Sequence, residues 1–250
     1  MAKSADSFNR KSKYNAVIYK SDYFVIKHLE VFLTNSVNTY IRDGMVVADI
    51  GCGEQPLRDL VESKGGKYIG IDISQNTKKN IDVIASITNI PLEDNVFDCI
   101  LCTEVLEHVP DTHSAFVEMK RLMKINGHLI ITTPFCYPLH EEPYDYVRLT
   151  HHCMLAEATA NNLSVVSIQK SGNELEAIAT ILSNMLRPIN SKSFIVTIYY
   201  LPFRLIINTL TSVISYIFRK LLPCKTYLNN FIILEKTSNT IDELGYRRYS

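Results

Sequence analysis

The chain has 250 residues, of which 26 are basic and 26 acidic, so its formal net charge is zero. This length suits one large α/β domain or one domain with an insertion. A neutral chain has no overall field to attract nucleic acid, and we expect no nucleic-acid partner. The six cysteines fall mainly in or beside predicted core elements, which indicates a reducing cytoplasm rather than a disulfide framework.

The first part of the chain alternates between helical and strand patterns. Residues 1–20 are polar and predict a mobile arm, and the apolar spacing of residues 22–41 predicts a helix. Apolar strand candidates follow at 45–50, 67–72, 82–85, 97–102, 128–133, 163–170 and 229–236. Helices fit at 56–64, with Pro56 in the first turn, at 112–124, with a stop at Asn126-Gly127, and at 151–162, capped by Thr150. Continuous apolar strands between helices predict a parallel sheet covered on both faces.

The alternation of strand and helix patterns stops in residues 174–228, which are largely apolar. Polar residues recur there every three or four positions, as a narrow stripe on a wide apolar helix: Arg204, Asn208, Ser212, Ser215 and Arg219. The last residues, 237–250, are polar and predict a mobile tail.

The first chemical signal is the stretch VVADIGCGEQPLRDL, residues 46–60. Glycines directly after a strand let backbone N–H groups approach a ligand closely. Pro56 stands where a dinucleotide fingerprint has its third glycine, which disfavours NAD and FAD, and no Lys-Ser/Thr completes a P-loop. Asp72, at the end of the next strand, could accept hydrogen bonds from both ribose hydroxyls. The pattern indicates an adenosine ligand without a pyrophosphate.

At this point the chain resembles the class I S-adenosylmethionine-dependent methyltransferases. ADIGCG looks like their motif I and GIDIS like their ribose-binding acidic motif, and the segments ITNIPLEDNVFDCILCTEVLEHVPD and EMKRLMKINGHLIITTP are similar to their later strands. The resemblance covers about residues 44–170 and returns at 229–236. It implies a Rossmann-like, mostly parallel seven-stranded sheet with an antiparallel last strand. The methyltransferase domain would span 21–236, with 174–228 as a helical insertion between strands six and seven.

The resemblance also implies S-adenosylmethionine as the cofactor. Asp49 would hold its amino end, Asp72 its ribose, and Ser86 stands where many members place an aspartate that accepts from the adenine amino group. The residues assigned to the cofactor are Asp49, Gly51, Gly53, Asp72, Ile73, Ser86, Ile87 and Thr103.

Catalytic candidates should follow the fourth and fifth strands, because open α/β sheets bind ligands at their carboxyl ends. A hydroxyl acceptor needs a base to take its proton, and His140 is the first choice. The candidates are His140, His108, Tyr144, Asp145 and Arg148. Arg148 could equally well bind the substrate or form a structural ion pair with Asp145 or Glu142. The loop after strand five looks like that of methyltransferases of surface polysaccharides and lipid-linked sugars, which implies O-methylation of a sugar, lipid-linked glycan or small-molecule hydroxyl.

Two alternatives remain. Glu104, Glu107 and His108, joined by His140, resemble the metal site of small-RNA 2′-O-methyltransferases. The chain lacks a basic patch or an added RNA domain to neutralise phosphates, so we assign no metal and disfavour this function. A second alternative is a non-catalytic, cofactor-binding partner subunit.

Residues 194–222 contain no uncharged span of 18 residues, which disfavours a transmembrane helix. This segment could cover the sheet as core, form a dimer interface, or lie in a membrane interface with Arg219 and Lys220 at the headgroups. We therefore expect a cytoplasmic protein, with contact to the inner face of the membrane as one option.

Overall fold

The architecture was obtained from a computed structural model, which describes residues 14–186, 194–218, 221 and 225–238. The predicted arm is therefore described only from residue 14, and residues 239–250 of the predicted tail lie outside the described residues. The same holds for Arg219 and Lys220.

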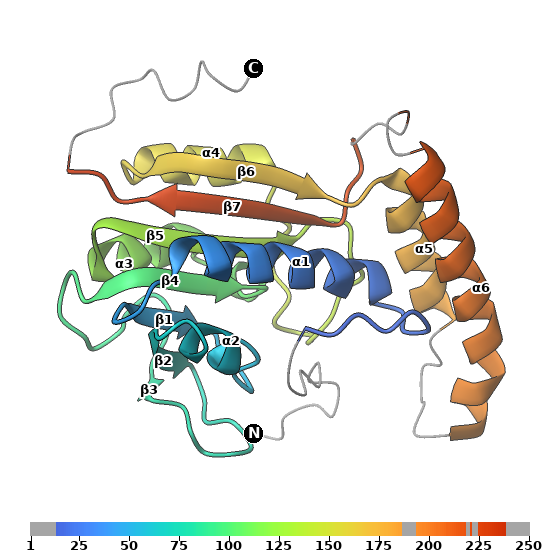
Figure 1. Ribbon diagram of the computed structural model, residues 1–250, viewed down its shortest axis with the longest axis horizontal. Helices are drawn as coiled ribbons and strands as arrows, with labels where there is room; N and C mark the ends of the chain where they lie inside the picture. Colours follow the sequence, from blue (N-terminus) through green and yellow to red (C-terminus); the bar gives the residue numbers. More distant parts are fainter. Residues whose placement is uncertain (1–13, 187–193, 219–220, 222–224, 239–250) are drawn as a thin grey trace.

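The described residues form one seven-stranded sheet in the order β3-β2-β1-β4-β5-β7-β6 (Figure 1). Neighbouring strands are parallel except β7, which is antiparallel to both β5 and β6. This confirms the predicted Rossmann-like sheet with an antiparallel last strand. The strands are β1 (Val46–Ile50), β2 (Lys67–Asp72), β3 (Val83–Ile84), β4 (Phe97–Thr103), β5 (Met123–Pro134), β6 (Ser164–Ser171) and β7 (Asn229–Glu235).

Helices cover both faces of the sheet, with α1 in front of it and α3 and α4 behind it in Figure 1. The core accordingly divides into two clusters of buried side chains. Cys99 belongs to the α1 side and Cys102 to the α3 side, as their spacing along one strand predicts. The helices are α1 (Tyr23–Tyr40), α2 (Arg58–Glu62), the 3₁₀ turn η1 (Leu106–His108), α3 (Thr112–Leu122), α4 (His151–Ala160), α5 (Glu174–Met185) and α6 (Phe194–Phe218).

Helix α1 forms because its apolar residues return every three or four positions and bury one face against the sheet. Phe24, Leu29, Leu33 and Val37 are all nearly inaccessible to solvent. Each such side chain contributes about 1.5–3 kcal/mol on burial. The stacked rings of Phe32 and β7 Phe231, 4.4 Å apart, anchor the helix over β7.

Two local predictions were wrong. Pro56 does not begin a helix, because the chain is still in the turn there and α2 starts only at Arg58. The Asn126-Gly127 stop lies inside β5, since α3 already ends at Leu122. Asn126 does adopt a left-handed φ of 62°, but within an irregularity of the β4–β5 pairing rather than in a turn. The cap prediction for Thr150 is confirmed, because its hydroxyl accepts from the Cys153 amide at 3.1 Å.

The segment between β6 and β7 contains α5 and α6, which confirms the helical insertion. The polar stripe of α6 points inward. Asn208 donates to the carbonyls of Ile18 and Lys20 at 2.6 and 3.0 Å, and Arg204 donates to the carbonyl of Leu186 at 2.8 Å. These contacts tie α6 to the N-terminal segment and to the end of α5.

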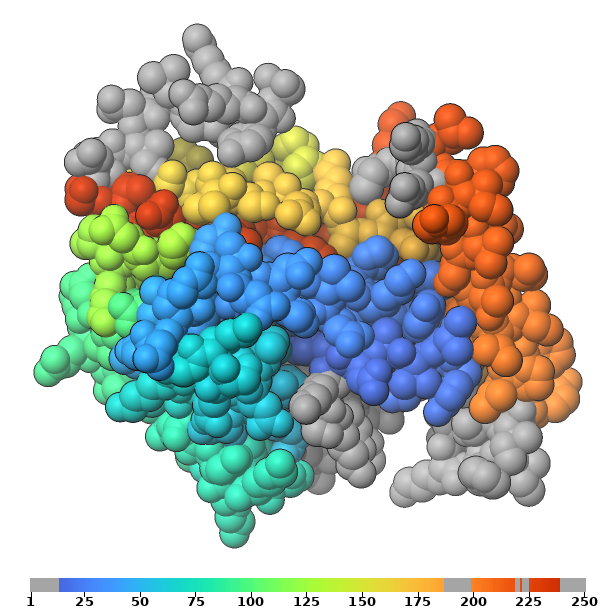
Figure 2. Space-filling model, in the orientation of Figure 1, coloured from blue at the N-terminus to red at the C-terminus, as the bar shows by residue number. Residues whose placement is uncertain are grey.

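The apolar face of α6 is consequently turned to solvent, so the interpretation of this face as ordinary core is wrong. The exposed large side chains of α5 and α6, here called the α5–α6 apolar face, are Ile178, Ile181, Leu182, Met185, Tyr199, Phe203, Leu205, Ile206, Leu210, Val213, Ile214, Tyr216, Ile217 and Phe218. In Figure 2, α6 (orange) forms one flank of the molecule. By length and composition, Tyr199–Phe218 could cross a membrane, and only 17% of its most apolar window is buried.

Candidate active site

The glycine turn after β1 lies beside the end of β2, because the two strands pair in parallel. Gly51 has a φ of 72°, and a Cβ there would lie 2.3 Å from the side chain of Val105, so only glycine fits. Gly53, with a φ of 50°, has no described atom within 4 Å of where a Cβ would stand. Its amide donates to Oδ2 of Asp72 at 2.9 Å. The turn thus fixes the predicted ribose carboxylate beside open space.

The side chain of Asp49, in β1, is held by a residue of the neighbouring strand β2. Its carboxylate is buried and accepts a hydrogen bond of 2.5 Å from the Tyr68 hydroxyl. Burial, and then the charge of Asp49, raise the pKa of Tyr68 far above its usual range, so the phenol stays protonated and remains a donor. The guanidinium of Arg58 lies 4.5 Å from the centroid of the Tyr68 ring.

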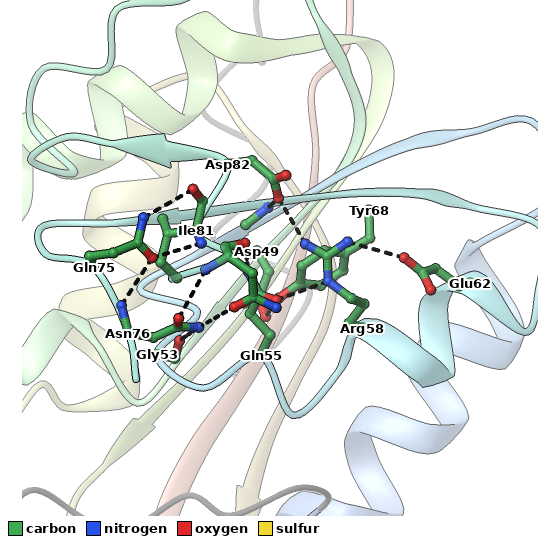
Figure 3. Close-up of polar contacts among 12 residues, drawn as sticks. Asp49, Gly53, Gln55, Arg58, Glu62, Tyr68, Gln75, Asn76, Ile81 and Asp82 are labelled. Atoms are coloured by element: carbon green, nitrogen blue, oxygen red, sulfur yellow. Dashed lines mark hydrogen bonds and ion pairs between the residues drawn. The ribbon is translucent and has the colours of Figure 1, made fainter. Parts of the chain in front are cut away.

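A polar network stiffens the turn from outside, as Figure 3 shows. Arg58 donates to the Gln55 side chain and to Asp82, both at 2.9 Å. The same Asp82 oxygen accepts from the Gly70 amide at 2.7 Å. The Asn76 side chain donates to the carbonyl of Gly53 at 3.1 Å. Sequence reasoning missed these supports, because no local pattern shows that residues 53–58 and 70–82 meet.

The residues assigned to adenine lie at the ends of β2 and β3. Ile73 follows Asp72 directly and is 75% exposed, so its side chain is available to pack on a ring. Ile87 is partly buried against the core on the α3 side. The Ser86 hydroxyl already pairs with Thr88 at 2.9 Å. The Thr103 hydroxyl pairs with Tyr14 at 3.0 Å, which brings the N-terminal segment onto the end of β4, a contact that the sequence did not predict.

The loop after β5 is tied to the turn after β4. The amides of Tyr146 and Val147 both donate to the carbonyl of Glu107, at 2.8 and 3.2 Å. Because β4 and β5 are neighbours in the sheet, this loop brings His140 to His108, with ring centroids 4.9 Å apart. The structure therefore brings together the two predicted candidate bases.

Glu107 lies between the two imidazoles. Its Oε1 is 3.7 Å from Nε2 of His108 and 3.7 Å from Nε2 of His140. The Nδ1 of His108 faces the carbonyl of Tyr144 at 2.8 Å, and the Nδ1 of His140 faces Asp145 at 3.1 Å. Burial lowers the pKa of His140, but the Glu107 and Asp145 carboxylates outweigh it and leave this pKa above its usual value.

The remaining catalytic candidates support this cluster. Arg148 binds both oxygens of Asp145, in the structural ion pair that the sequence left open. Burial raises the pKa of Asp145, but hydrogen bonds from Arg148 and the His140 amide bring it below its usual value. The Tyr144 phenol is exposed, and this residue contributes its carbonyl instead.

The structure removes one residue from the set of metal ligands that the sequence suggested. Glu104 lies outside the cluster and accepts from the Asn229 side chain at 2.9 Å. The three groups that come within 4.8 Å of one another are Glu107, His108 and His140. The sequence suggested Glu107 only as a metal ligand and did not include it among the catalytic candidates. The structure places it beside two of them, His108 and His140.

The sheet order and the glycine turn define a Rossmann-like methyltransferase fold. Residues 48–131 match the family described as methyltransferase domain. Among solved structures, a putative sarcosine dimethylglycine methyltransferase from Galdieria sulphuraria superposes with a TM-score of 0.58 at 16% identity, covering 86% of this chain and 88% of that one. A SAM-dependent methyltransferase from Archaeoglobus fulgidus gives 0.54 at 18% identity, covering 82% and 94%. The chain therefore has the fold of the S-adenosylmethionine-dependent methyltransferases, and its residues 48–131 match a methyltransferase-domain family.

Curated relatives match over a shorter region. A ubiquinone biosynthesis O-methyltransferase of Alkalilimnicola ehrlichii is 30% identical over 118 residues, which is 42% of this chain and 46% of that protein. The chain thus spans about half the length of the curated relatives that it matches.

Proposed function

We propose that the protein transfers a methyl group from S-adenosylmethionine to a hydroxyl group of a sugar, a lipid-linked glycan or another small molecule. One observation carries this proposal: the turn holding Asp72 and the cluster of Glu107, His108 and His140 follow neighbouring strands at the same edge of the sheet. A donor site and an acceptor-activating group on one edge are what a transfer reaction needs.

The glycine turn fits the cofactor. Asp72 offers carboxylate oxygens to the ribose, Asp49 lies deeper toward the amino end, and the open space at Gly53 lets the methionine part approach the backbone. Exposed Ile73 would cover one face of the adenine. When bound, the cofactor supplies a methyl group activated by its sulfonium charge. The chain then has to align the acceptor and take its proton.

The cluster after β4 and β5 suits the acceptor hydroxyl. His140 is oriented by Asp145, which is itself locked by Arg148. An imidazole oriented in this way on Nδ1 presents Nε2 to the reacting proton. The relative named as an O-methyltransferase supports a hydroxyl acceptor over a nitrogen or carbon acceptor.

We also propose that the protein works at a membrane surface, on an acceptor held there by lipid. Fourteen large apolar side chains of the α5–α6 apolar face are exposed, which is more apolar surface than scattered single residues would give. Helix α6 has 25 residues, about 37 Å of length, and its inward polar stripe leaves the apolar side for lipid. In Figure 1, β4 and β6 point toward the side where α5 and α6 stand, and the proposed acceptor site lies at these strand ends.

Turnover would test the proposed function. The purified protein is incubated with S-adenosylmethionine and either a total lipid extract or a water-soluble glycan extract, and S-adenosylhomocysteine is measured. We expect product with the lipid extract and at least tenfold less with the Asp72→Ala variant. Equal product from both proteins, or none from the wild type with either extract, would overturn the proposal.

A further inference from the structure

Glu107 is a buried carboxylate to which no described group donates a hydrogen bond. Its side chain is 1% exposed, and neither oxygen has a hydrogen-bond partner among the residues that the structure describes. Burying a carboxylate costs several kcal/mol unless a cation or donors compensate it. Its closest ionisable neighbours are the two Nε2 atoms at 3.7 Å, a distance too long for a hydrogen bond.

The partners of the two imidazoles indicate where their protons are. A carbonyl can only accept, so the 2.8 Å contact with Tyr144 places a proton on Nδ1 of His108. The negative charge of Asp145, 3.1 Å from Nδ1 of His140, favours a proton on that nitrogen as well. In the neutral rings each Nε2 then carries a lone pair. Two lone pairs and a carboxylate thus converge on one point, which is unfavourable unless a cation occupies it.

We propose that Glu107, His108 and His140 bind a divalent transition-metal ion. A tetrahedral ion with bonds of about 2.1 Å keeps its ligands about 3.4 Å apart, close to the observed 3.7 Å between Oε1 and each Nε2. Two imidazoles and one carboxylate select Zn²⁺, Fe²⁺ or a related ion over Mg²⁺ or Ca²⁺.

The surroundings of the cluster are those of a metal site. In such sites each ligand imidazole directs its other ring nitrogen to a carbonyl or a carboxylate. Nδ1 of His108 does so with the Tyr144 carbonyl, and Nδ1 of His140 lies 3.1 Å from the Asp145 carboxylate. Their side chains are 17% and 20% exposed, so the cluster is open on one side while Glu107 closes the other. Three protein ligands with an open position are the pattern of a catalytic ion.

The ion gives the cluster a chemical role that rests on the proposed methyl transfer. An acceptor hydroxyl that takes the open position would have its pKa lowered by the ion and would release its proton more easily, to solvent water on the open side of the cluster. His140 would then act as a ligand rather than as the free base. Binding of the ion itself does not depend on the identity of the acceptor.

Metal titration of the full chain tests the proposal without cofactor or acceptor. After treatment with a chelator, the protein is titrated with Zn²⁺ by calorimetry and with Co²⁺ by visible absorption, which reports the coordination geometry. We expect one ion per chain. Glu107→Gln and His140→Ala should each weaken binding at least tenfold. His113→Ala is the control, because His113 is an exposed imidazole that also pairs with a glutamate, Glu157, at 2.9 Å, and it should bind like the wild type.

Substoichiometric binding by the wild type would overturn the metal site, as would wild-type affinity in both Glu107→Gln and His140→Ala. A proton shared by His140 and Glu107 is the competing occupant, and it predicts that outcome. Circular dichroism of the metal-free variants separates lost ligands from lost fold, and His108→Ala provides a third ligand deletion. Ion binding without methyl transfer would count against the proposed function alone, whereas methyl transfer without ion binding would count against the metal alone.

Discussion

The Tyr68 hydroxyl donates a hydrogen bond of 2.5 Å to Oδ2 of Asp49, which joins the central strand of the cofactor site to its neighbour. Both side chains are buried, and their strands pair in parallel register. A buried carboxylate needs such a donor to remain ionised and oriented. Tyr68 is therefore a positioning residue for Asp49, and this role is invisible in the Gly-rich motif itself.

Tyr68→Phe should lower the free energy of unfolding by about 1.5–3 kcal/mol, the contribution of a hydrogen bond to a charged group. Cofactor affinity should fall as well, because Asp49 loses the donor that orients it. Urea unfolding and calorimetry measure the two effects. Tyr19→Phe, at an exposed tyrosine, is the matched control and should change neither. An unchanged cofactor affinity in Tyr68→Phe would remove Asp49 from the site.

Asp72→Ala should weaken the binding of S-adenosylmethionine by about 1–3 kcal/mol, as expected for lost hydrogen bonds to a carboxylate. The change also removes the acceptor of the Gly53 and Ser74 amides. Asp72→Asn keeps one acceptor oxygen for the turn, so it separates the loss of the ribose from the loss of the turn. Calorimetry that finds wild-type affinity in both variants would contradict the assignment.

His140→Ala should lower turnover by about 10²–10⁴, the scale for loss of a group that removes the acceptor proton directly or, as a metal ligand, makes its removal easier. Cofactor affinity should stay near wild type, because His140 follows β5 and the glycine turn follows β1. Single-turnover kinetics with saturating cofactor measures the first quantity and calorimetry the second. A deficit confined to cofactor affinity would argue that His140 does not act on the acceptor.

Most of the fold was predictable because its strands are short, continuous apolar runs. Predicted and observed strands such as 67–72 coincide, and others differ by a residue or two at their ends. The start of β5 was not predictable. Residues 123–127 continue the helical pattern of α3, and only pairing with Phe97 draws Met123 into the sheet. Tertiary pairing thus decides an assignment that local propensity leaves open.

The candidate site was predictable where a motif carries it and unpredictable where distant segments meet. The sequence offered Glu104 and Glu107 together, but Glu104 adopts a φ of 54° and turns to Asn229, which lies 125 residues further along the chain. The α6 stripe shows the same limit. The spacing of polar residues identifies two faces of a helix, whereas hydrogen bonds to the carbonyls of Ile18 and Lys20 decide that the polar face points inward.

Asp98 should make stability depend on pH. Burial raises its pKa, but hydrogen bonds from Lys124 and from the Val46 amide bring the pKa below its usual value. A carboxyl whose folded pKa lies below its unfolded value of about 4 stabilises the fold above that value. This stabilisation is lost as the pH falls through the folded pKa.

Asp98→Asn isolates this contribution. The difference in unfolding free energy between wild type and variant should be largest near neutral pH and shrink below about pH 4. Urea unfolding at several pH values measures it. Asp59→Asn, at an exposed acidic residue of α2, serves for comparison. A difference that stays constant across the acidic range would show that Asp98 contributes through shape rather than charge.

The α5–α6 apolar face should bind lipid. Ile206, Leu210 and Ile217 are each more than half exposed on α6, so charged side chains there meet water rather than core. Wild-type protein should float with vesicles of phosphatidylcholine and phosphatidylglycerol. Lysine or glutamate at these three positions should release it, because a charge resists transfer into the apolar interface. Folding and cofactor affinity should be unchanged.

Val31→Lys provides the control, since Val31 is equally exposed but lies on α1, away from this face. It should leave vesicle binding intact. Asn208→Leu tests the opposite side of α6: it removes the donor to the Ile18 and Lys20 carbonyls and should destabilise the fold without strengthening vesicle binding. If the wild type does not float, and the α6 substitutions instead separate a dimer in light scattering, a second copy of the chain covers this face and the membrane proposal is wrong.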